Sequence, residues 1–481
     1  MRLRENRWLV VLAMVLVYLL SRALFSWMGV SFDESPLTRS WQNLDVVALQ
    51  HDLLAGVHHQ HAQPPLFNLF LGVVLKLFPV AHAAAFSLVF RALGLAAYLL
   101  SYAILTRLGF GRKIAFLAAT LFILTPTAVL YESWLFYTWP IAVLLALAAY
   151  LLLLHEETLE VRYAVGFLVV IALLCLTRSM FHVVFLVACA AGVLLVRSPG
   201  RRRILAFAVG LLLVVGALPL KNYLVFGSAQ TSSWLGMNLW KMVGHNVAGA
   251  DLPMDAGVGA VPAFSPIDRY PERYREVPAR FSSVPVLREE RKSTGEPNLN
   301  HHGYLAVSRE YLKGARHLIA ADPGAYLRSV GKGWGYYCRP AWDYWFLQDN
   351  RERLQPYIDL VSLAPIRFLL EELFLGEDAA AGAFPRSSYL LVPGMLILVV
   401  VNLVLGLVRR FRGGSRPRSI VFLAFLVLTV LYVALLGNAL EYGENNRFRV
   451  QTDLLLYLAV IVSLRDLGGA LRQRVFEKRD P

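Results

Sequence analysis

More than any other feature, long apolar runs limit how this chain can fold. A helix needs about 20 predominantly apolar residues to cross a hydrocarbon core about 30 Å thick. The 481 residues are 57% hydrophobic and have a mean hydropathy of +0.53. The runs predict about ten membrane spans, near 8–29, 83–105, 114–131, 138–154, 161–177, 180–196, 204–222, 388–408, 419–436 and 450–464. We therefore expect an all-α polytopic membrane protein.

The positions of Lys and Arg predict which connections face the cytoplasm. Basic residues gather in alternate connections, as the positive-inside rule requires. These connections are MRLRENR, TRLGFGRK, RSPGRRR, RRFRGGSRPR and the tail LRQRVFEKRD. We expect a multi-pass protein of the inner, cytoplasmic membrane with both termini in the cytoplasm. The net charge of +14 falls mostly in these loops, so it predicts a lipid bilayer as partner and no nucleic acid.

The expected spans divide the chain into three parts. Residues 1–222 form an N-terminal transmembrane module, whose first external loop covers 30–82. Residues 223–387 form a large extracytoplasmic loop or subdomain, with helices predicted near 303–321 and 323–337. Residues 388–481 form a C-terminal transmembrane module and a cytoplasmic tail.

The first external loop is expected to fold against the membrane surface. Apolar residues recur at near-helical spacing from Trp41 to Leu54, which predicts an interfacial amphipathic helix with Ser40 as its N-cap. The Pro64-Pro65 pair opens a second short helix, because proline is tolerated in a first helical turn. The apolar run that follows, 66–78, is too short to span a membrane.

Three carboxylates are expected at the external ends of spans. Asp33 and Glu34 follow the first span directly, and Glu132 stands in YESWLFY, at the external end of the third. A carboxylate beside a cleft can act as a general base. Each of the three could equally be a solvated charge at the membrane boundary. In that case Glu132 would lie beside the belt of aromatic residues that is typical of the membrane interface.

Four cations are expected at the same level, where the positive-inside rule disfavours positive charge. They are Arg178, Lys221, Arg447 and Arg449. Guanidinium groups bind phosphate in a bidentate manner and Lys supplies a point charge, so the group predicts an anion site such as a lipid-linked phosphate. The alternative for each residue is a side chain that snorkels to the interface.

Two further arginines and a histidine-rich stretch have open interpretations. Arg22 and Arg91 lie inside or at the edge of apolar runs, where they could be functional or could pair with an acid such as Glu34 or Glu132. A divalent metal could bind to three histidines of the first loop, which could equally be solvent-facing. These histidines are His58, His59 and His61.

In pattern and order, these motifs resemble the integral-membrane glycosyltransferases of the C-type (GT-C) superfamily, particularly protein O-mannosyltransferases and lipid A aminoarabinose transferases. The matching stretches are FDE, QPPLFNLFLGVVLKLF, FRALGL, YESWLF, LTRS, LKNYLVFGS and NRFRVQTDLLLYLA. They cover residues 1–240 and 388–465 and leave the loop between unplaced. The chain has HAQPPL where many relatives place His directly before the prolines.

The resemblance implies transfer of a sugar from a polyprenyl-phosphate donor on the extracytoplasmic face, with inversion of the anomeric centre. The acceptor could be a lipid, a glycan or a protein. Asp33 would be the base that deprotonates the acceptor, Glu34 would orient a substrate, and Glu132 matches a second acidic position.

The resemblance also implies residues that bind the donor. Arg447 matches the family's basic motif before the last span and would hold the donor phosphate. The expected helpers in phosphate binding are Arg178, Lys221 and Arg449, and further cleft candidates are His61, Arg91 and Asn68.

Two other functions remain open for this sequence. An O-antigen-ligase-like transferase would use a diphosphate donor, which the early acidic motif disfavours. A transporter or flippase of lipid-linked sugars would place charges near the bilayer midplane and show two related halves. The charges of this chain cluster at one face instead, and no internal repeat is evident.

Overall fold

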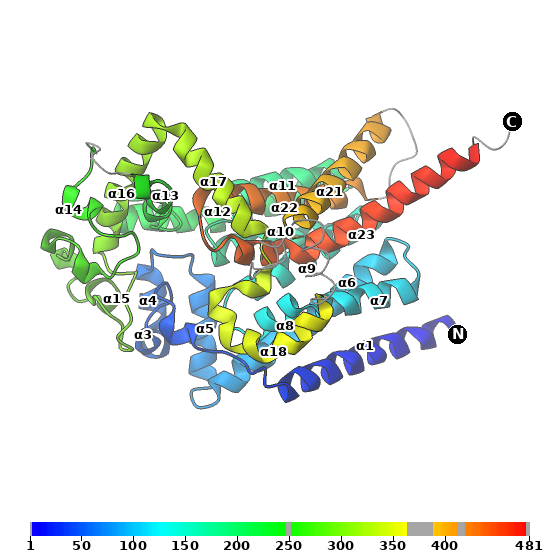
Figure 1. Ribbon diagram of the computed structural model, residues 1–481, viewed down its shortest axis with the longest axis horizontal. Coiled ribbons are helices and arrows are strands. Elements are labelled where there is room, and N and C mark those ends of the chain that lie inside the picture. The colour runs from blue at the N-terminus through cyan, green and yellow to red at the C-terminus, as the bar shows by residue number, and fades with distance from the viewer. Residues whose placement is uncertain (1, 247–251, 363–387, 412–418, 478–481) are drawn as a thin grey trace, which may run out of the picture.

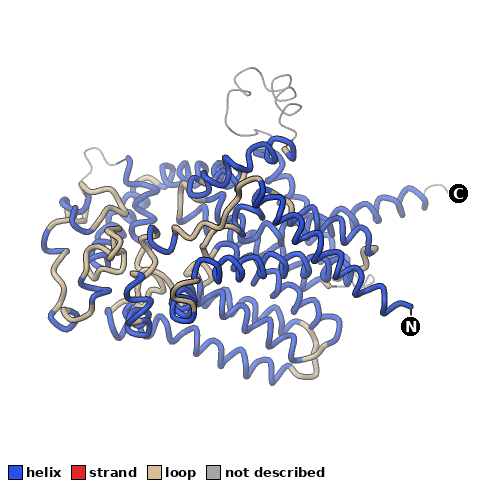
Figure 2. Tube along the Cα trace, turned by 90° about the horizontal axis from the view of Figure 1, so that it is seen from below, coloured by secondary structure: helices blue, strands red, loops and turns tan. Residues whose placement is uncertain are grey.

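A computed structural model describes residues 2–246, 252–362, 388–411 and 419–477, and these residues form an assembly of helices without strands (Figures 1 and 2). Both termini lie at one end of a helical body, and a loop-rich cap lies at the other end (Figure 1). The basic stretch 412–418, residues 363–387 of the expected subdomain and the last residues of the tail fall outside the described residues.

Among the described residues, six helices are long and apolar enough to cross a membrane. They are α1 (Arg2–Trp27), α6 (His82–Arg107), α9 (Thr138–Thr158), α12 (Arg201–Phe226), α21 (Ser388–Phe411) and α22 (Ile420–Leu440). Two further predicted spans are shorter helices, α10 (Val161–Thr177) and α11 (Val183–Leu195). The last predicted span lies inside α23 (Asn445–Glu477). A polytopic membrane protein is thus confirmed, whereas the number of ten spans stays a prediction.

The predicted span at 114–131 is bent. It consists of α7 (Arg112–Ile123) and α8 (Pro126–Glu132), which meet at an angle of 60°. Proline disfavours helical geometry in the residue before it, so α7 ends ahead of Thr125 and Pro126 opens α8. The Thr125 side chain caps α8 by accepting a hydrogen bond from Ala128 N. The bend determines where Glu132 and the segment after it lie.

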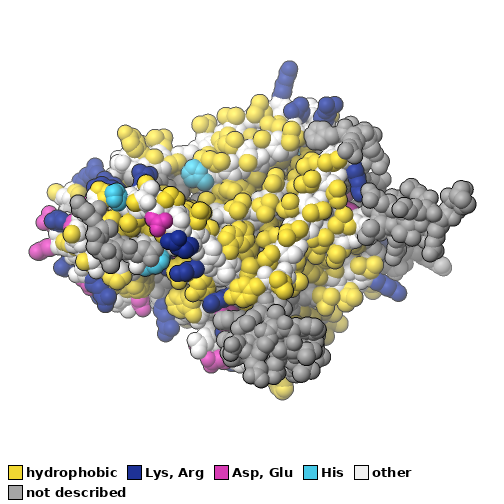
Figure 3. Space-filling model, turned by 45° about the horizontal axis from the view of Figure 1, so that its top comes forward, with side chains coloured by type: hydrophobic (Ala, Val, Ile, Leu, Met, Phe, Trp, Pro, Cys, Tyr) yellow, Lys and Arg dark blue, Asp and Glu magenta, His cyan; other side chains and the backbone are white. Residues whose placement is uncertain are grey.

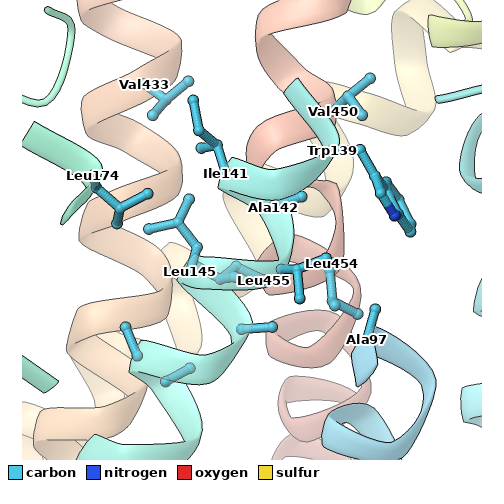
Figure 4. Packing of buried hydrophobic residues seen from close by; sticks show 14 of the residues in the cluster. Ala97, Trp139, Ile141, Ala142, Leu145, Leu174, Val433, Val450, Leu454 and Leu455 are labelled. Carbon is cyan, nitrogen blue, oxygen red and sulfur yellow. The ribbon is translucent and has the colours of Figure 1, made fainter. Parts of the chain in front are cut away.

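The body is organised around α9 and α22. Among the apolar windows of the long helices, those of α9 and α22 are 72% and 61% buried, against 22–28% for α1, α12 and α21. In Figure 4, side chains of α9 such as Ile141 and Leu145 pack between α10, α22 and α23. The outer helices expose their leucines, and apolar side chains cover much of the body in Figure 3, as expected for a surface that faces lipid.

The first external loop forms four short helices. They are α2 (Pro36–Arg39), α3 (Val46–His51), α4 (Leu53–His59) and α5 (Leu66–Leu77). The expected start of α5 after the proline pair is confirmed, but the single helix capped by Ser40 is wrong. The Asp45 side chain caps α3 by accepting from Val47 N, and Asp52 separates α3 from α4.

Much of the described extracytoplasmic segment folds into a cap with its own apolar core. The cap helices of four or more residues are α13 (Leu235–Val243), α14 (Ala256–Gly259), α15 (Pro285–Arg288) and α16 (Gly303–Ala321). Helix α17 (Pro323–Cys338) leads from the cap back to the body, where its end and α18 (Gln348–Val361) join the body's core. The predicted helices at 303–321 and 323–337 are confirmed as α16 and α17. Six single-turn 3-10 helices connect them, at Gly244–Asn246, Ile267–Arg269, Glu272–Tyr274, Ala279–Phe281, Ala341–Asp343 and Trp345–Leu347. Met237, Trp240 and Tyr311 lie in the core between α13 and α16.

Gly236 allows α13 to approach α16 closely, because a Cβ added there would lie 1.8 Å from the Ser308 carbonyl oxygen. We expect Gly236→Ala to lower the free energy of unfolding of the purified protein by about 3 kcal/mol through overpacking. Gly216→Ala in α12, where a Cβ meets nothing within 4 Å, is the control and changes it by no more than about 1 kcal/mol. Equal effects in a denaturant titration would contradict the close contact.

Candidate functional site

A cavity of about 1460 Å³ opens between the helix ends of the body and the cap. Its walls come from segments that are far apart in the sequence: 33–42, 134–137, 178–182, 230–245, 259–264, 296–299, 344–349 and 436–448, together with Gln63. Small-molecule sites usually have about 300–1,000 Å³, so this cavity has room for more than one substrate. Three other cavities among the described residues have only about 20, 460 and 10 Å³.

Asp33 lines this cavity and is fixed by its backbone. Its N–H donates to the Ser133 carbonyl at 2.7 Å, and its own carbonyl accepts from Leu135 N at 2.9 Å, which forms a short parallel bridge with the segment after α8. The carboxylate oxygen Oδ1 accepts from Ser35 N at 2.9 Å. Among the described residues Oδ2 accepts no hydrogen bond, so it is available to a substrate.

Arg178 lines the same cavity at the end of α10. Its side chain is 6% exposed and lies 4.4 Å above the Phe448 ring and 5.2 Å above the Tyr137 ring. Its Nη1 is buried without a hydrogen-bond partner, and the guanidinium forms no ion pair with a described carboxylate. A buried and unpaired cation is unfavourable on its own, so this position favours an anionic ligand.

Arg447 also lines the cavity, but a neighbouring carboxylate already neutralises its charge. It forms an ion pair with Glu444, and its Nη1 lies 3.4 Å from the Tyr137 hydroxyl. Burial raises the pKa of Glu444, but Arg447 and then Lys241 outweigh it, and the pKa lies below its usual range. Glu444 is therefore charged and holds Arg447 in place.

A second acid-base pair borders the cavity between α22 and α23. Lys241 Nζ lies 2.6 Å from Glu441 Oε1. Burial raises the pKa of Glu441, with Lys241 acting against it. Sequence reasoning missed Lys241, Glu441 and Glu444. The acidic stretch EYGE directly before NRFR was the signal that could have identified the two glutamates.

The structure places the other two predicted acids away from this cavity. Glu34 turns to the start of α6, where its Oε2 lies 3.6 Å from His82 Nε2. Glu132 is 3% exposed and accepts from Arg22 Nε at 2.8 Å and from the Tyr18 hydroxyl at 2.7 Å. The expectation that Arg22 pairs with an acid is confirmed for Glu132.

Two of the four predicted cations also serve the framework. Lys221 Nζ donates to the carbonyl oxygens of His58 and Gln60, at 2.9 and 3.0 Å, and so fixes the end of α4. Arg449 binds Asp453 at 3.1 Å and donates to the Tyr337 carbonyl at 2.7 Å. Neither residue lines the cavity.

The three further cleft candidates lie outside the cavity as well. Asn68 is buried and accepts from Leu44 N at 2.8 Å, which joins α5 to the loop before α3. Arg91 is exposed on α6. His61 is buried, with Nδ1 2.9 Å from Ser233 Oγ and Nε2 2.9 Å from the Asn300 carbonyl. Burial lowers the pKa of His61 to about 3, so the ring is neutral near pH 7.

The histidines of the first loop do not form a metal site. Both ring nitrogens of His61 contact protein groups, and His59 Nδ1 lies 2.9 Å from the Ala55 carbonyl. His58 packs edge-on against His59. No group of three potential ligands is found in the part of the chain that the structure describes.

Comparisons of the chain with protein-family models, with curated proteins and with solved structures find no match. The functional argument therefore starts from the cavity itself.

Replacing one partner of the buried pair tests the framework role of Glu132. We expect Glu132→Gln to lower the free energy of unfolding by about 3–5 kcal/mol, because Arg22 would be left as an uncompensated buried charge. The double variant Arg22→Leu with Glu132→Leu should recover most of this loss. Thermal and denaturant unfolding of the unchanged chain and the two variants measures the loss and its recovery, and an unchanged free energy of unfolding in Glu132→Gln would contradict the framework role.

Proposed function

We propose that this chain is a membrane glycosyltransferase, which moves a sugar from a polyprenyl-phosphate donor to an acceptor. One observation carries this proposal: the free Asp33 carboxylate and the buried, unpaired Arg178 line the same cavity at the end of the apolar body. A base and an anion site are the two elements that such a transfer needs. The order of motifs that resembles the C-type superfamily supports the same reaction.

The reaction follows from these two groups. Asp33 takes the proton of the acceptor hydroxyl or amine, whose freed electron pair attacks the anomeric carbon. The bond between this carbon and the phosphate oxygen breaks, and the electron pair leaves with the polyprenyl phosphate. Direct displacement inverts the anomeric centre. Arg178 stabilises the phosphate, whose negative charge grows as the bond breaks.

The two cavity arginines have different parts in this proposal. Arg178 lacks a described carboxylate partner and is the primary phosphate ligand. Arg447 is held by Glu444 and assists through the shared neighbour Tyr137, which contacts both guanidinium groups. Lys221 and Arg449 are assigned to the framework, because their polar contacts are with protein groups.

The same proposal includes a topology. Both termini face the cytoplasm of an inner-membrane protein with about ten spans, and the cavity faces the periplasm or exterior. The common end of the two termini and the position of the cap at the opposite end support this arrangement (Figure 1). The polar and charged side chains over the cap in Figure 3 support its place in water.

Asp33→Asn tests the base. We expect transfer to fall by about 10²–10⁴-fold, because the amide cannot accept the acceptor proton. Asp52→Asn is the matched control, since Asp52 is an exposed carboxylate of the same loop outside the cavity. The measurement is mass spectrometry of envelope glycans, glycolipids and proteins from a deletion strain that carries each variant. Full activity of Asp33→Asn would refute the assignment, and movement of lipid-linked sugar without transfer would identify a transporter.

Arg178→Gln tests the anion site. We expect the KM for the lipid-linked donor to rise more than 10-fold, because the unpaired guanidinium is lost. Arg178→Lys keeps the charge but loses the two-pronged geometry, so its KM should lie between those of the two other proteins. Initial rates at varied donor concentration measure the effect. An unchanged KM in Arg178→Gln would place the phosphate elsewhere.

A further inference from the structure

The cavity has two chemically different ends. The helix end is formed where α9, α10 and α23 begin or end, and it holds Tyr137, Arg178 and Arg447. The cap end is formed by the first external loop and the cap, and it holds Trp41, Gln42, Gln63, Trp234 and Phe264. The proposed donor site occupies only the helix end, next to the apolar body. The cap end therefore has space and side chains that the donor phosphate does not use.

Three buried polar atoms at the cap end have no hydrogen-bond partner among the described residues. They are Gln42 Nε2, Gln63 Oε1 and Trp234 Nε1. Buried polar groups are nearly always satisfied, and each one left unsatisfied costs about 1–3 kcal/mol. Two of these atoms donate and one accepts. A ligand at this end must therefore offer both acceptors and donors.

Two tryptophans at the cap end are held in fixed positions. Trp41 Nε1 donates to Glu296 Oε2 at 2.8 Å, and Trp234 packs edge-on against Phe264 with the ring centroids 5.5 Å apart. Both residues are only partly buried, so each leaves some aromatic surface exposed. Fixed aromatic rings offer a large contact area at a low entropy cost.

A sugar ring matches this combination of groups. Its faces carry C–H groups that pack on an aromatic ring, and its edges carry hydroxyl groups that both donate and accept. A hydrocarbon chain would leave the three polar atoms unsatisfied, and the described residues of the cap end include no strand edge that would pair with an extended peptide. The chemistry of this end favours a carbohydrate.

We propose that the cap end is the acceptor site and that the acceptor is a glycan, one sugar of which contacts Trp234 while its hydroxyl groups bind Gln42 and Gln63. This inference rests on the proposed glycosyl transfer. Asp33 lines the same cavity and takes the proton of one acceptor hydroxyl, whose oxygen then forms the new bond to the anomeric carbon. The volume of about 1460 Å³ allows donor and acceptor to be bound together.

The test measures binding apart from catalysis. The full chain in lipid nanodiscs is titrated with size-fractionated oligosaccharides released from the envelope polysaccharide of the source cells, with isothermal titration calorimetry as readout. We expect saturable binding that is at least 10-fold weaker in Trp234→Leu and in Gln63→Leu. Trp27→Leu and Gln50→Leu are matched controls outside the cavity and should bind as the unchanged chain does. Absent binding, or equal binding by all variants, overturns the proposal.

A second arm identifies the form of the acceptor. Donor consumption is followed with the free oligosaccharides, with a total glycolipid extract and with a Ser/Thr-rich peptide. Transfer to the oligosaccharides indicates a polysaccharide acceptor, and transfer to the extract alone, weakened by Trp234→Leu, indicates a glycolipid headgroup. Transfer to the peptide alone would overturn the proposal of a glycan acceptor but would still support the proposed glycosyl transfer. Glycan binding without donor consumption would refute the proposed glycosyl transfer but would still support a glycan-binding site at the cap end.

Discussion

The buried ion pair between Arg22 and Glu132 is the constraint on which the position of the Asp33 carboxylate depends. It joins α1 to α8 across 110 residues of sequence, inside a part of the molecule where both side chains are less than 10% exposed. Such a pair has little freedom, because separating it would leave two charges without water or partner. The bridge between Asp33 and Trp134 begins directly after α8. The ion pair thus fixes both chain segments whose pairing aims Asp33 at the cavity.

The cap end of the cavity is held together by neutral hydrogen bonds instead. His61 bridges Ser233 and the Asn300 carbonyl, and Ala62 N donates to Asn300 Oδ1, so the first external loop and the cap share one hydrogen-bonded seam. Burial keeps the imidazole of His61 uncharged, with a pKa of about 3, which lets it sit in this seam without a counter-ion. Lys221 fixes the preceding turn through its carbonyl oxygens. Charged and neutral contacts together hold the walls of one site.

Much of the local structure could be predicted from the sequence, whereas the pairing of side chains could not. Apolar runs and proline positions predicted α5, α16 and α17 because these signals are local. The charges at the span ends included Asp33, Arg178 and Arg447, which the structure brings to one cavity. The same reasoning could not distinguish these cavity residues from Glu132 and Arg449. The partner of Glu132 lies on another helix, and the partner of Arg449 lies on the next turn of its own helix. The sequence indicates how deep in the membrane a charged residue lies, but only the folded structure shows which residue it pairs with.

This difference in pairing explains why Asp33 rather than Glu132 suits the proposed reaction. Glu132 has both carboxylate oxygens bound by the Arg22 guanidinium and lies outside the cavity, so an acceptor in the cavity does not reach it. Asp33 lines the cavity, and its Oδ2 accepts no hydrogen bond from a described residue, so in the proposed reaction this atom takes the acceptor's proton. In the same step the leaving phosphate gains one negative charge, and the net charge in the cavity stays constant. The charge moves from Asp33 toward Arg178 and Arg447, so the unpaired cation favours the transition state more than the bound substrates.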